Sequence, residues 1–145
     1  MDAQERFLDA IENNNVDEIK YILDNNLYNP DSFNDWAIRF SSQNGYLDIV
    51  RLLLNDNRVD PSADCNSSLR GAAAKGYTEI VELLLRDNRV DPTDRYNEAI
   101  QVANERNHTE IVNLIWKHKK VKKFIEIDDP KLYAKLITKD KVEQF

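Results

Sequence analysis

Few residues in this chain of 145 amino acids could perform catalysis or bind a metal ion. The chain has two histidines, His108 and His118, and one cysteine, Cys65, which are too few for a zinc site made of these ligands. It has no glycine-rich phosphate loop, no G-x-S-x-G elbow and no Cys–His pair with an orienting acid. We therefore expect no enzymatic activity, no cofactor and no small-molecule substrate.

The carboxylates are numerous but recur at regular positions. Asp48 and Glu79 stand at the starts of predicted helices, whereas Asp60 and Asp91 stand in predicted loops, and the members of each pair are 31 residues apart. Catalytic carboxylates need unequal surroundings, because their pKa values must differ. Periodic placement therefore favours a role in architecture over a role in catalysis.

The densest group of charges is a cluster of lysines near residue 120. Residues 1–116 carry 11 Lys and Arg against 21 Asp and Glu, while residues 117–145 carry nine against five. Nucleic acid binding is therefore unexpected for the acidic body, and the basic segment is the only candidate. One interpretation of the cluster is a polyanion-binding or nuclear-import patch, and the other, which we favour, is a solvated helix end whose cations complement unpaired carbonyls. The lysines are Lys117, Lys119, Lys120, Lys122 and Lys123.

Composition limits the class of protein. The chain is 41% hydrophobic and 32% charged, and it contains no apolar run long enough to span a bilayer. Three Gly and four Pro are few for an all-β domain, so helix is the expected element. A lone cysteine and the absence of a secretory leader favour an intracellular location, the cytoplasm first and the nucleus second.

A repeat of 31 residues runs along the chain. Residues 47–61 match residues 78–92 at 11 of 15 positions, and further shifts reach residues 109–116 and 16–23. Each unit has the pattern of two helices joined at a Gly or Asn, and such units bury their apolar faces by stacking. We predict one all-α domain over residues 1–145, a solenoid of helix–turn–helix units. The repeats span about 1–29, 30–60, 61–91 and 92–122, and a capping segment at 123–145 contains a helix that begins at Pro130.

Residues 67–85 carry a family resemblance. Their sequence, SSLRGAAAKGYTEIVELLL, resembles the ankyrin-repeat pattern T-P-L-H-x-A-A-x-x-G-H-x-x-I-V-x-x-L-L, and the match recurs four times over about residues 3–121. The short form that closes in R-V-D-P is similar to ankyrin repeats of amoeba-infecting giant DNA viruses and some protists. The resemblance implies a non-enzymatic protein-interaction module that binds its partner through a concave face and loop tips, as an adaptor toward a viral or host factor.

The sequence departs from the ankyrin pattern in two ways. Arg39, Arg70 and Gln101 stand where the pattern has a histidine, so other groups must satisfy the backbone atoms that this histidine binds. The repeat is also two residues shorter than the usual 33, and the deletions fall in the loops, so we expect shortened loops in place of β-hairpins.

Carried over position by position, the resemblance implies a set of partner-binding residues. Phe33 is the best candidate for an interface anchor, because it is an apolar residue at a loop tip, although packing against Trp36 or Tyr28 is an equal alternative. The full set is Ser32, Phe33, Asp35, Gln43 and Asn44 in the second unit, Ala63, Asp64, Asn66, Ala74 and Lys75 in the third, and Asp94, Arg95, Asn97, Glu105 and Arg106 in the fourth. We expect a monomer, while polyanion binding through the lysines and a purely structural assembly unit remain alternatives.

Overall fold

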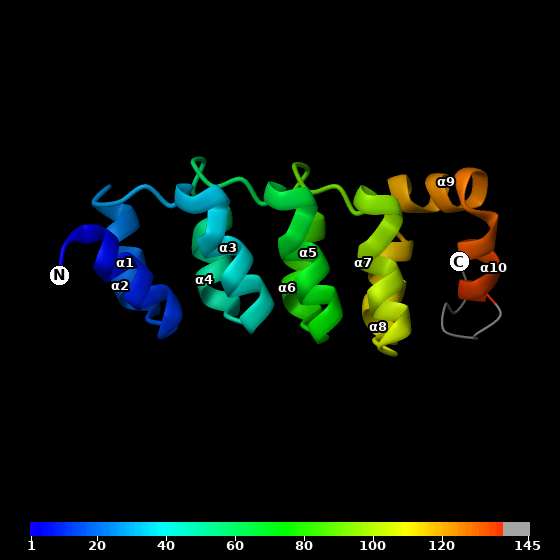
Figure 1. The fold of residues 1–145 in the computed structure, drawn as a ribbon, viewed down its shortest axis with the longest axis horizontal. Helices are drawn as coiled ribbons and strands as arrows, with labels where there is room; N and C mark the ends of the chain where they lie inside the picture. Colours follow the sequence, from blue (N-terminus) through cyan, green and yellow to red (C-terminus); the bar gives the residue numbers. More distant parts are fainter. Residues whose placement is uncertain (138–145) are drawn as a thin grey trace.

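The computed structural model describes residues 1–137, and every regular element in this part of the chain is an α-helix. The predicted all-α class is therefore confirmed for these residues, and helix pairs follow one another along an elongated array (Figure 1). The helices are α1 (Ala3–Glu12), α2 (Val16–Asp24), α3 (Ser32–Asn44), α4 (Leu47–Leu54), α5 (Ala63–Lys75), α6 (Thr78–Arg86), α7 (Asp94–Glu105), α8 (Thr109–Trp116), α9 (Lys119–Asp128) and α10 (Pro130–Ile137).

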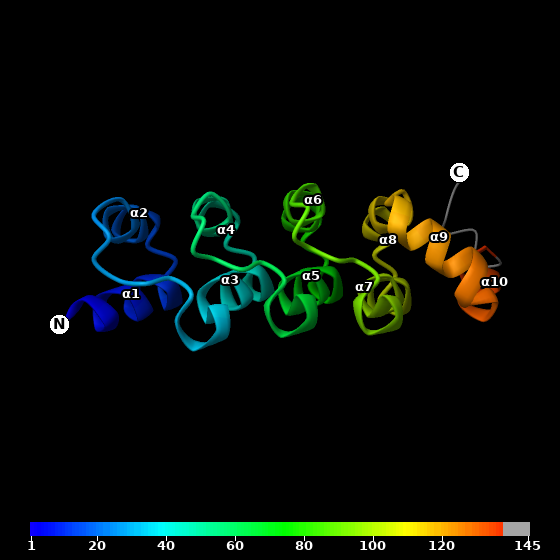
Figure 2. The ribbon, with the colours of Figure 1, turned by 90° about the horizontal axis from the view of Figure 1, so that it is seen from above.

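The helix pairs form two layers. Helices α1, α3, α5 and α7 lie in one layer, which we call the odd layer, and α2, α4, α6 and α8 lie in the other, the even layer (Figure 2). Neighbouring helices in the odd layer lie close together. At Gly71 of α5 there is no room for a Cβ atom, which would clash with the side chain of Gln43 on α3. The apolar stripe of α6 supplies Ile80, Val81 and Leu84 to the core, each at most 2% exposed. Burial of such stripes between neighbouring units stabilises the stack.

A residue with positive φ joins the two helices of each pair. Asn14, Gly45, Gly76 and Asn107 adopt φ values of 53°, 78°, 82° and 64°. A Cβ atom at Gly76 would lie 2.8 Å from Cε1 of His108, whose Nε2 is 3.2 Å from the carbonyl oxygen of Ala74. His108 therefore serves packing between consecutive pairs. Glycine is required here both for its positive φ and for this close approach.

Hydrogen-bonded loops connect each pair to the next, and no β-strand occurs in residues 1–137. Asp87 Oδ1 accepts hydrogen bonds from the backbone N–H and from Nε of Arg89, at 3.0 and 2.9 Å, and Arg89 Nη1 donates to the carbonyl of Val59 in the preceding loop at 2.8 Å. Asp56 and Arg58 make the same pairing. Hydrogen bonds from the arginines hold the pKa values of Asp56 and Asp87 below their ordinary value, although burial opposes the shift. Each shortened loop is thus fastened to the loop before it.

The array ends in a cap made of α9 and α10. Asp129 Oδ1 accepts from the backbone N–H of Leu132 at 2.9 Å, so the predicted helix start at Pro130 is confirmed. Leu132 and Leu136 are buried against the preceding helices. The sequence did not predict α9, which takes the place of a loop. Residues 138–145, part of the predicted capping segment, lie outside the described residues.

Candidate binding surface at the repeat tips

The first turn of α3, α5 and α7 contains three consecutive residues with left-handed backbone. Their φ angles lie between 49° and 62°, and regular right-handed helix begins only after them. Left-handed backbone costs roughly 1–2 kcal/mol for each residue that has a Cβ atom, and none of these nine is glycine. We call these three segments the tips: Phe33, Asn34 and Asp35; Asp64, Cys65 and Asn66; Arg95, Tyr96 and Asn97.

In the first two tips, the third residue accepts a hydrogen bond from the next loop. Asp35 Oδ1 accepts a hydrogen bond from the backbone N–H of Asp60 at 2.8 Å, and Asn66 Oδ1 accepts one from Asp91 at 2.9 Å. Asn66 Nδ2 also donates to Asp94 at 2.9 Å. Burial raises the pKa of Asp35, as do the charges of Asp60 and Asp31, while the hydrogen bond from Asp60 and the charge of Arg39 oppose the shift. These hydrogen bonds join residues of consecutive units that are 25 or 28 positions apart in sequence.

The residues at the position of the missing histidine hold the tip carbonyls. Arg39 donates from Nε to Asn34 and from Nη2 to Phe33, at 2.9 and 3.2 Å. Arg70 makes the equivalent pair of bonds to Cys65 and Asp64, both at 3.1 Å. In the last tip, Gln101 donates one bond of 2.7 Å to the carbonyl of Tyr96. In each of the three tips, the side chain at this repeat position thus stabilises the strained backbone.

Ion pairs join neighbouring tips across the odd layer. Arg39 Nη1 lies 3.6 Å from Asp64 Oδ2, and Arg70 Nη1 lies 3.2 Å from Glu98 Oε2. Glu98 also lies 3.3 Å from Nε of Arg95. Pairs of this exposure contribute little to stability, typically under about 1 kcal/mol each. They add to the hydrogen bonds that fix how each tip sits relative to the next.

The first two residues of each tip are exposed and differ from tip to tip. Phe33 is 60% exposed and Tyr96 is 80% exposed, and Asn34, Asp64, Cys65 and Arg95 are exposed as well. The predicted contact residues include Phe33, Asp64 and Arg95 but not the neighbouring Asn34, Cys65 and Tyr96. Tyr96 could have been found from the repeat register, which places it one residue after the position shared by Phe33, Asp64 and Arg95.

The Phe33 side chain is largely exposed, while its role as an interface anchor stays a prediction. The Trp36 ring packs against Phe40, with centroids 4.7 Å apart, and the Tyr28 ring packs against Phe7 at 5.1 Å. Phe33 takes part in neither ring pair and faces solvent over most of its surface. An exposed aromatic side chain on a fixed backbone suits an interface anchor, because little conformational freedom remains to be lost on binding.

Four of the predicted contact residues are buried and are corrected here. Asp35, Ala63 and Asn66 are 7%, 7% and 2% exposed, and Asn97 is fully buried. The resemblance implied exposed loop positions, but Asp35 and Asn66 turn inward and bind the next unit, Asn97 adopts the same inward conformation, and Ala63 is buried just before its tip. Ser32 and Asp94, which flank the tips, are half-buried. The accessible part of the predicted tip set is therefore Phe33, Asp64 and Arg95.

The remaining predicted residues form a second row at the opposite ends of the odd helices. The row begins eight positions after the last residue of each tip, which is about 12 Å along the helix at 1.5 Å per residue. Asn44 donates to the carbonyl of Phe40 at 2.8 Å, and Gln43 donates to Ser67 at 3.2 Å. The row consists of Gln43, Asn44, Lys75, Glu105 and Arg106, all exposed, and the half-buried Ala74. The predicted site is thus two rows along the odd layer.

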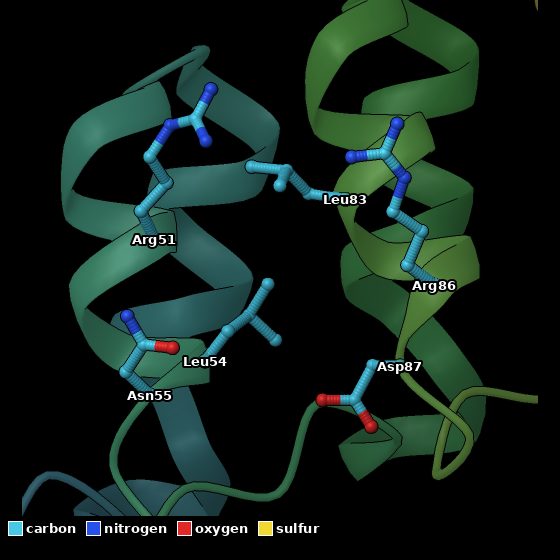
Figure 3. A pocket seen from close by; sticks show the side chains of 6 residues that line it. All are labelled: Arg51, Leu54, Asn55, Leu83, Arg86 and Asp87. Atoms are coloured by element: carbon cyan, nitrogen blue, oxygen red, sulfur yellow. The ribbon is translucent and has the colours of Figure 1, made fainter.

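Two grooves in the even layer repeat with the same 31-residue period. A groove of about 300 Å³ between α4 and α6 has Leu54 and Leu83 between two arginines on one side and Asn55 and Asp87 on the other (Figure 3). The repeat-equivalent groove between α2 and α4, of about 270 Å³, is lined by Lys20, Leu23, Asp24, Leu52, Asn55 and Asp56. Neither groove contains a predicted contact residue or a nucleophile beside a base. Leu83 lines one of these grooves and is only half-buried, whereas Leu84 is fully buried.

The lysine cluster lies mostly at the start of a helix. Lys117 follows α8, but the other four lysines fall within the first five residues of α9, whose first turn contains no acidic residue. The interpretation that these cations complement helix carbonyls is therefore wrong for those four, because a helix N-terminus disfavours cations. Burial and the charge of Lys120 lower the pKa of His118, which precedes α9, although Asp91 opposes the shift.

No group of three or more metal-ligating side chains occurs in residues 1–137, and none of their helices is long and apolar enough to cross a membrane. No protein-family model, curated protein or solved structure matches the chain.

Proposed function

We propose that the chain is a short-repeat ankyrin solenoid whose function is to bind a partner protein through its three tips. The observation that carries this proposal is the repeated left-handed backbone of the tips. Nine residues with side chains adopt it, and side chains at one repeat position hold it by hydrogen bonds to the tip carbonyls, two from Arg39, two from Arg70 and one from Gln101, while the exposed side chains vary. Strained backbone held in place by its surroundings is a feature of binding sites, so variable side chains on a constant frame support recognition.

The chemistry of the tips indicates the kind of partner. Phe33 and Tyr96 are two repeats apart and offer apolar anchors, and the charged side chains between them are Asp64 and Arg95. Tyr and Arg are the residues that most often dominate the energy of protein interfaces. None of the six exposed tip residues lines one of the grooves described above. This arrangement suits an extended protein surface better than a small molecule.

The proposal includes no catalytic step, cofactor or small-molecule substrate. An intracellular adaptor role, in the cytoplasm first and the nucleus second, follows from the resemblance to viral and protist ankyrin repeats and from the unpaired Cys65. In such a role, the solenoid presents or blocks a host factor bound at its tips.

The test is affinity capture from a host-like lysate with three matched baits. These are the wild type, a tip variant (Phe33→Ala, Arg95→Ala, Tyr96→Ala) and a groove variant (Lys20→Ala, Arg51→Ala, Arg86→Ala) that removes exposed cations from the even layer. Circular dichroism confirms equal helicity before capture. The proposal expects a protein that the wild type and the groove variant retain and the tip variant loses. Equal retention by all three baits would exclude the tips as the site.

A further inference from the structure

The two poles of the solenoid carry opposite charge. The side chains of residues 1–24 comprise seven carboxylates and two cations, a net charge of −5, and those of residues 117–137 comprise seven lysines and three carboxylates, a net charge of +4. Residues 25–116 carry 14 carboxylates and nine cations, also −5, but spread over a much longer segment. These two segments form the opposite ends of the array (Figures 1 and 2).

The charges at each pole are not neutralised from within. At the N-terminal pole both cations are already paired, Arg6 with Glu18 and Lys20 with Asp24. Within residues 1–137, no ion pair involves the pole's other carboxylates, which are Asp2, Glu5, Asp9, Glu12 and Asp17. At the C-terminal pole, no ion pair within residues 1–137 involves Lys117, Lys119, Lys123, Lys131 or Lys135. Lys120 Nζ lies 4.0 Å from Asp91 Oδ2, at the limit for an ion pair.

Each pole also exposes apolar surface among its charges. Phe124 lies with Lys120 and Lys123 along an open groove of about 240 Å³, which Thr93 and one carboxylate, Asp128, also line. Ile127 on the same helix is 66% exposed. At the other pole Tyr21 is 51% exposed, and Leu27, three residues beyond the end of α2, is 40% exposed. The two poles thus both expose apolar side chains among charged ones, and their net charges have opposite sign. Two surfaces with these properties are complementary and can form an interface.

We propose that copies of this chain associate head to tail, the outer face of α9 on one copy docking against the α1–α2 pole of the next. The contact joins two different surfaces, so an open assembly of any length keeps one free pole of each sign at its two ends and continues to grow unless the rotation closes it into a ring. Association of this kind is strongest at low ionic strength, because the Debye length falls from about 30 Å at 0.01 M to about 8 Å at 0.15 M salt. The proposal replaces the monomer expected from the sequence and does not depend on the tips.

Sedimentation velocity of the wild-type chain tests this directly. At low salt we expect the weight-average sedimentation coefficient to rise steadily with protein concentration, past the value for a dimer. In about 0.3 M salt, where the Debye length is well under 10 Å, it should return to the monomer value. A monomer at every concentration in low salt would overturn the proposal.

Charge reversal at either pole identifies the contact. A lysine-reversed variant (Lys119→Glu, Lys120→Glu, Lys123→Glu) and an acid-reversed variant (Asp9→Lys, Glu12→Lys, Asp17→Lys) should each associate at least about tenfold more weakly than the wild type. An equimolar mixture of the two should associate again, because each then meets a pole of opposite sign. If the mixture remains monomeric while both variants are folded by circular dichroism, the proposed contact is wrong.

A third variant controls for total charge. Arg51→Glu, Lys75→Glu and Arg106→Glu reverse three exposed cations between the poles, and this variant should associate as the wild type does. An equal loss of association in this control would overturn the assignment to the poles. A wild type that stays monomeric but binds a DNA duplex, with a steep salt dependence lost in the lysine-reversed variant, would instead assign the lysines to polyanion binding.

Discussion

The loop after α6 and the segment after α8 are 31 residues apart, and they differ in charge and in structure. After α6, Asp87 and Arg89 attract each other, and together they fasten the loop to the unit before it. After α8, the equivalent residues are His118 and Lys120, which repel each other when both are charged, and the chain continues as α9. A few polar residues in the connection thus distinguish a unit that is followed by another from one that is followed by a cap.

The same contrast appears in the third residue of the tips. Asn66 and Asn97 are both buried, with φ of 56° and 62°, but only Asn66 meets the backbone of a following loop. The side-chain Oδ1 and Nδ2 atoms of Asn97 are buried without a hydrogen-bond partner. The residue equivalent to Asp91 is Lys122, whose backbone N–H donates within α9 to His118. Asn97 therefore has the same left-handed backbone as Asn66 but lacks the hydrogen bond that Asn66 makes to the following loop.

The largest expected effect is a difference in the free energy of unfolding between a substitution in a repeat and one in the cap. Leu84→Ala in α6 removes a fully buried side chain between two neighbouring units and should lower the free energy of unfolding by about 2–5 kcal/mol. Leu136→Ala in α10, equally buried, should cost less, because undocking of a terminal element limits the loss. Urea denaturation measures both values. Equal losses would show that the cap is as integral to the stack as a repeat is.

The two tip asparagines provide the next test. Asn66→Ala leaves the N–H of Asp91 without its acceptor and should destabilise by about 2–3 kcal/mol. Asn97→Ala changes the same left-handed position but breaks no such bond, so its cost should be about 1 kcal/mol or less. The difference between the two free energies of unfolding is the quantity to measure. A larger loss at Asn97 would mean that its amide is bonded after all.

The loop pairing predicts a dependence on pH. The hydrogen bond from Arg89 lowers the pKa of Asp87, so this carboxylate stabilises the fold above the unfolded-state pKa of about 3.9 and the benefit is lost as pH falls through the lower native value. Asp87→Asn should therefore cost about 1–2 kcal/mol at pH 7. Thermal melts of both proteins from pH 7 to pH 3 should show the gap narrowing with acid. A gap that stays constant would contradict the role of the charge.

Asp35 should behave in the opposite way, with the smallest effect. Burial raises the pKa of Asp35, so its charge opposes folding at neutral pH, and that penalty disappears as pH falls through the raised native value toward about 3.9. Asp35→Asn keeps an acceptor for the N–H of Asp60 and matches Asn66, so it should stabilise by about 0.5–1 kcal/mol at pH 7. The same melts should show this gain vanishing in acid. A loss of stability at pH 7 would contradict the assignment.

The sequence predicted the features that depend on local pattern. The 31-residue period located the helix pairs, Gly45 and Gly76 marked the turns of positive φ, and the Asp129–Pro130 pair marked the start of α10. The tips were missed because none of their residues is glycine, and the Asn and Asp among them favour left-handed backbone only at single positions, which does not predict three consecutive residues of this kind. The hydrogen bond of Asn66 was missed because its donor is the backbone N–H of Asp91, 25 residues away.

The measurement that bears most directly on the tips is hydrogen exchange of the complex with the captured partner. If the tips bind it, peptides that cover residues 32–39, 63–70 and 94–101 exchange more slowly in the complex. Peptides over the even-layer groove at residues 51–55 and 83–87 should exchange at their free rate. Protection of that groove, or of residues 117–128 alone, with unchanged tips would contradict recognition through the tips.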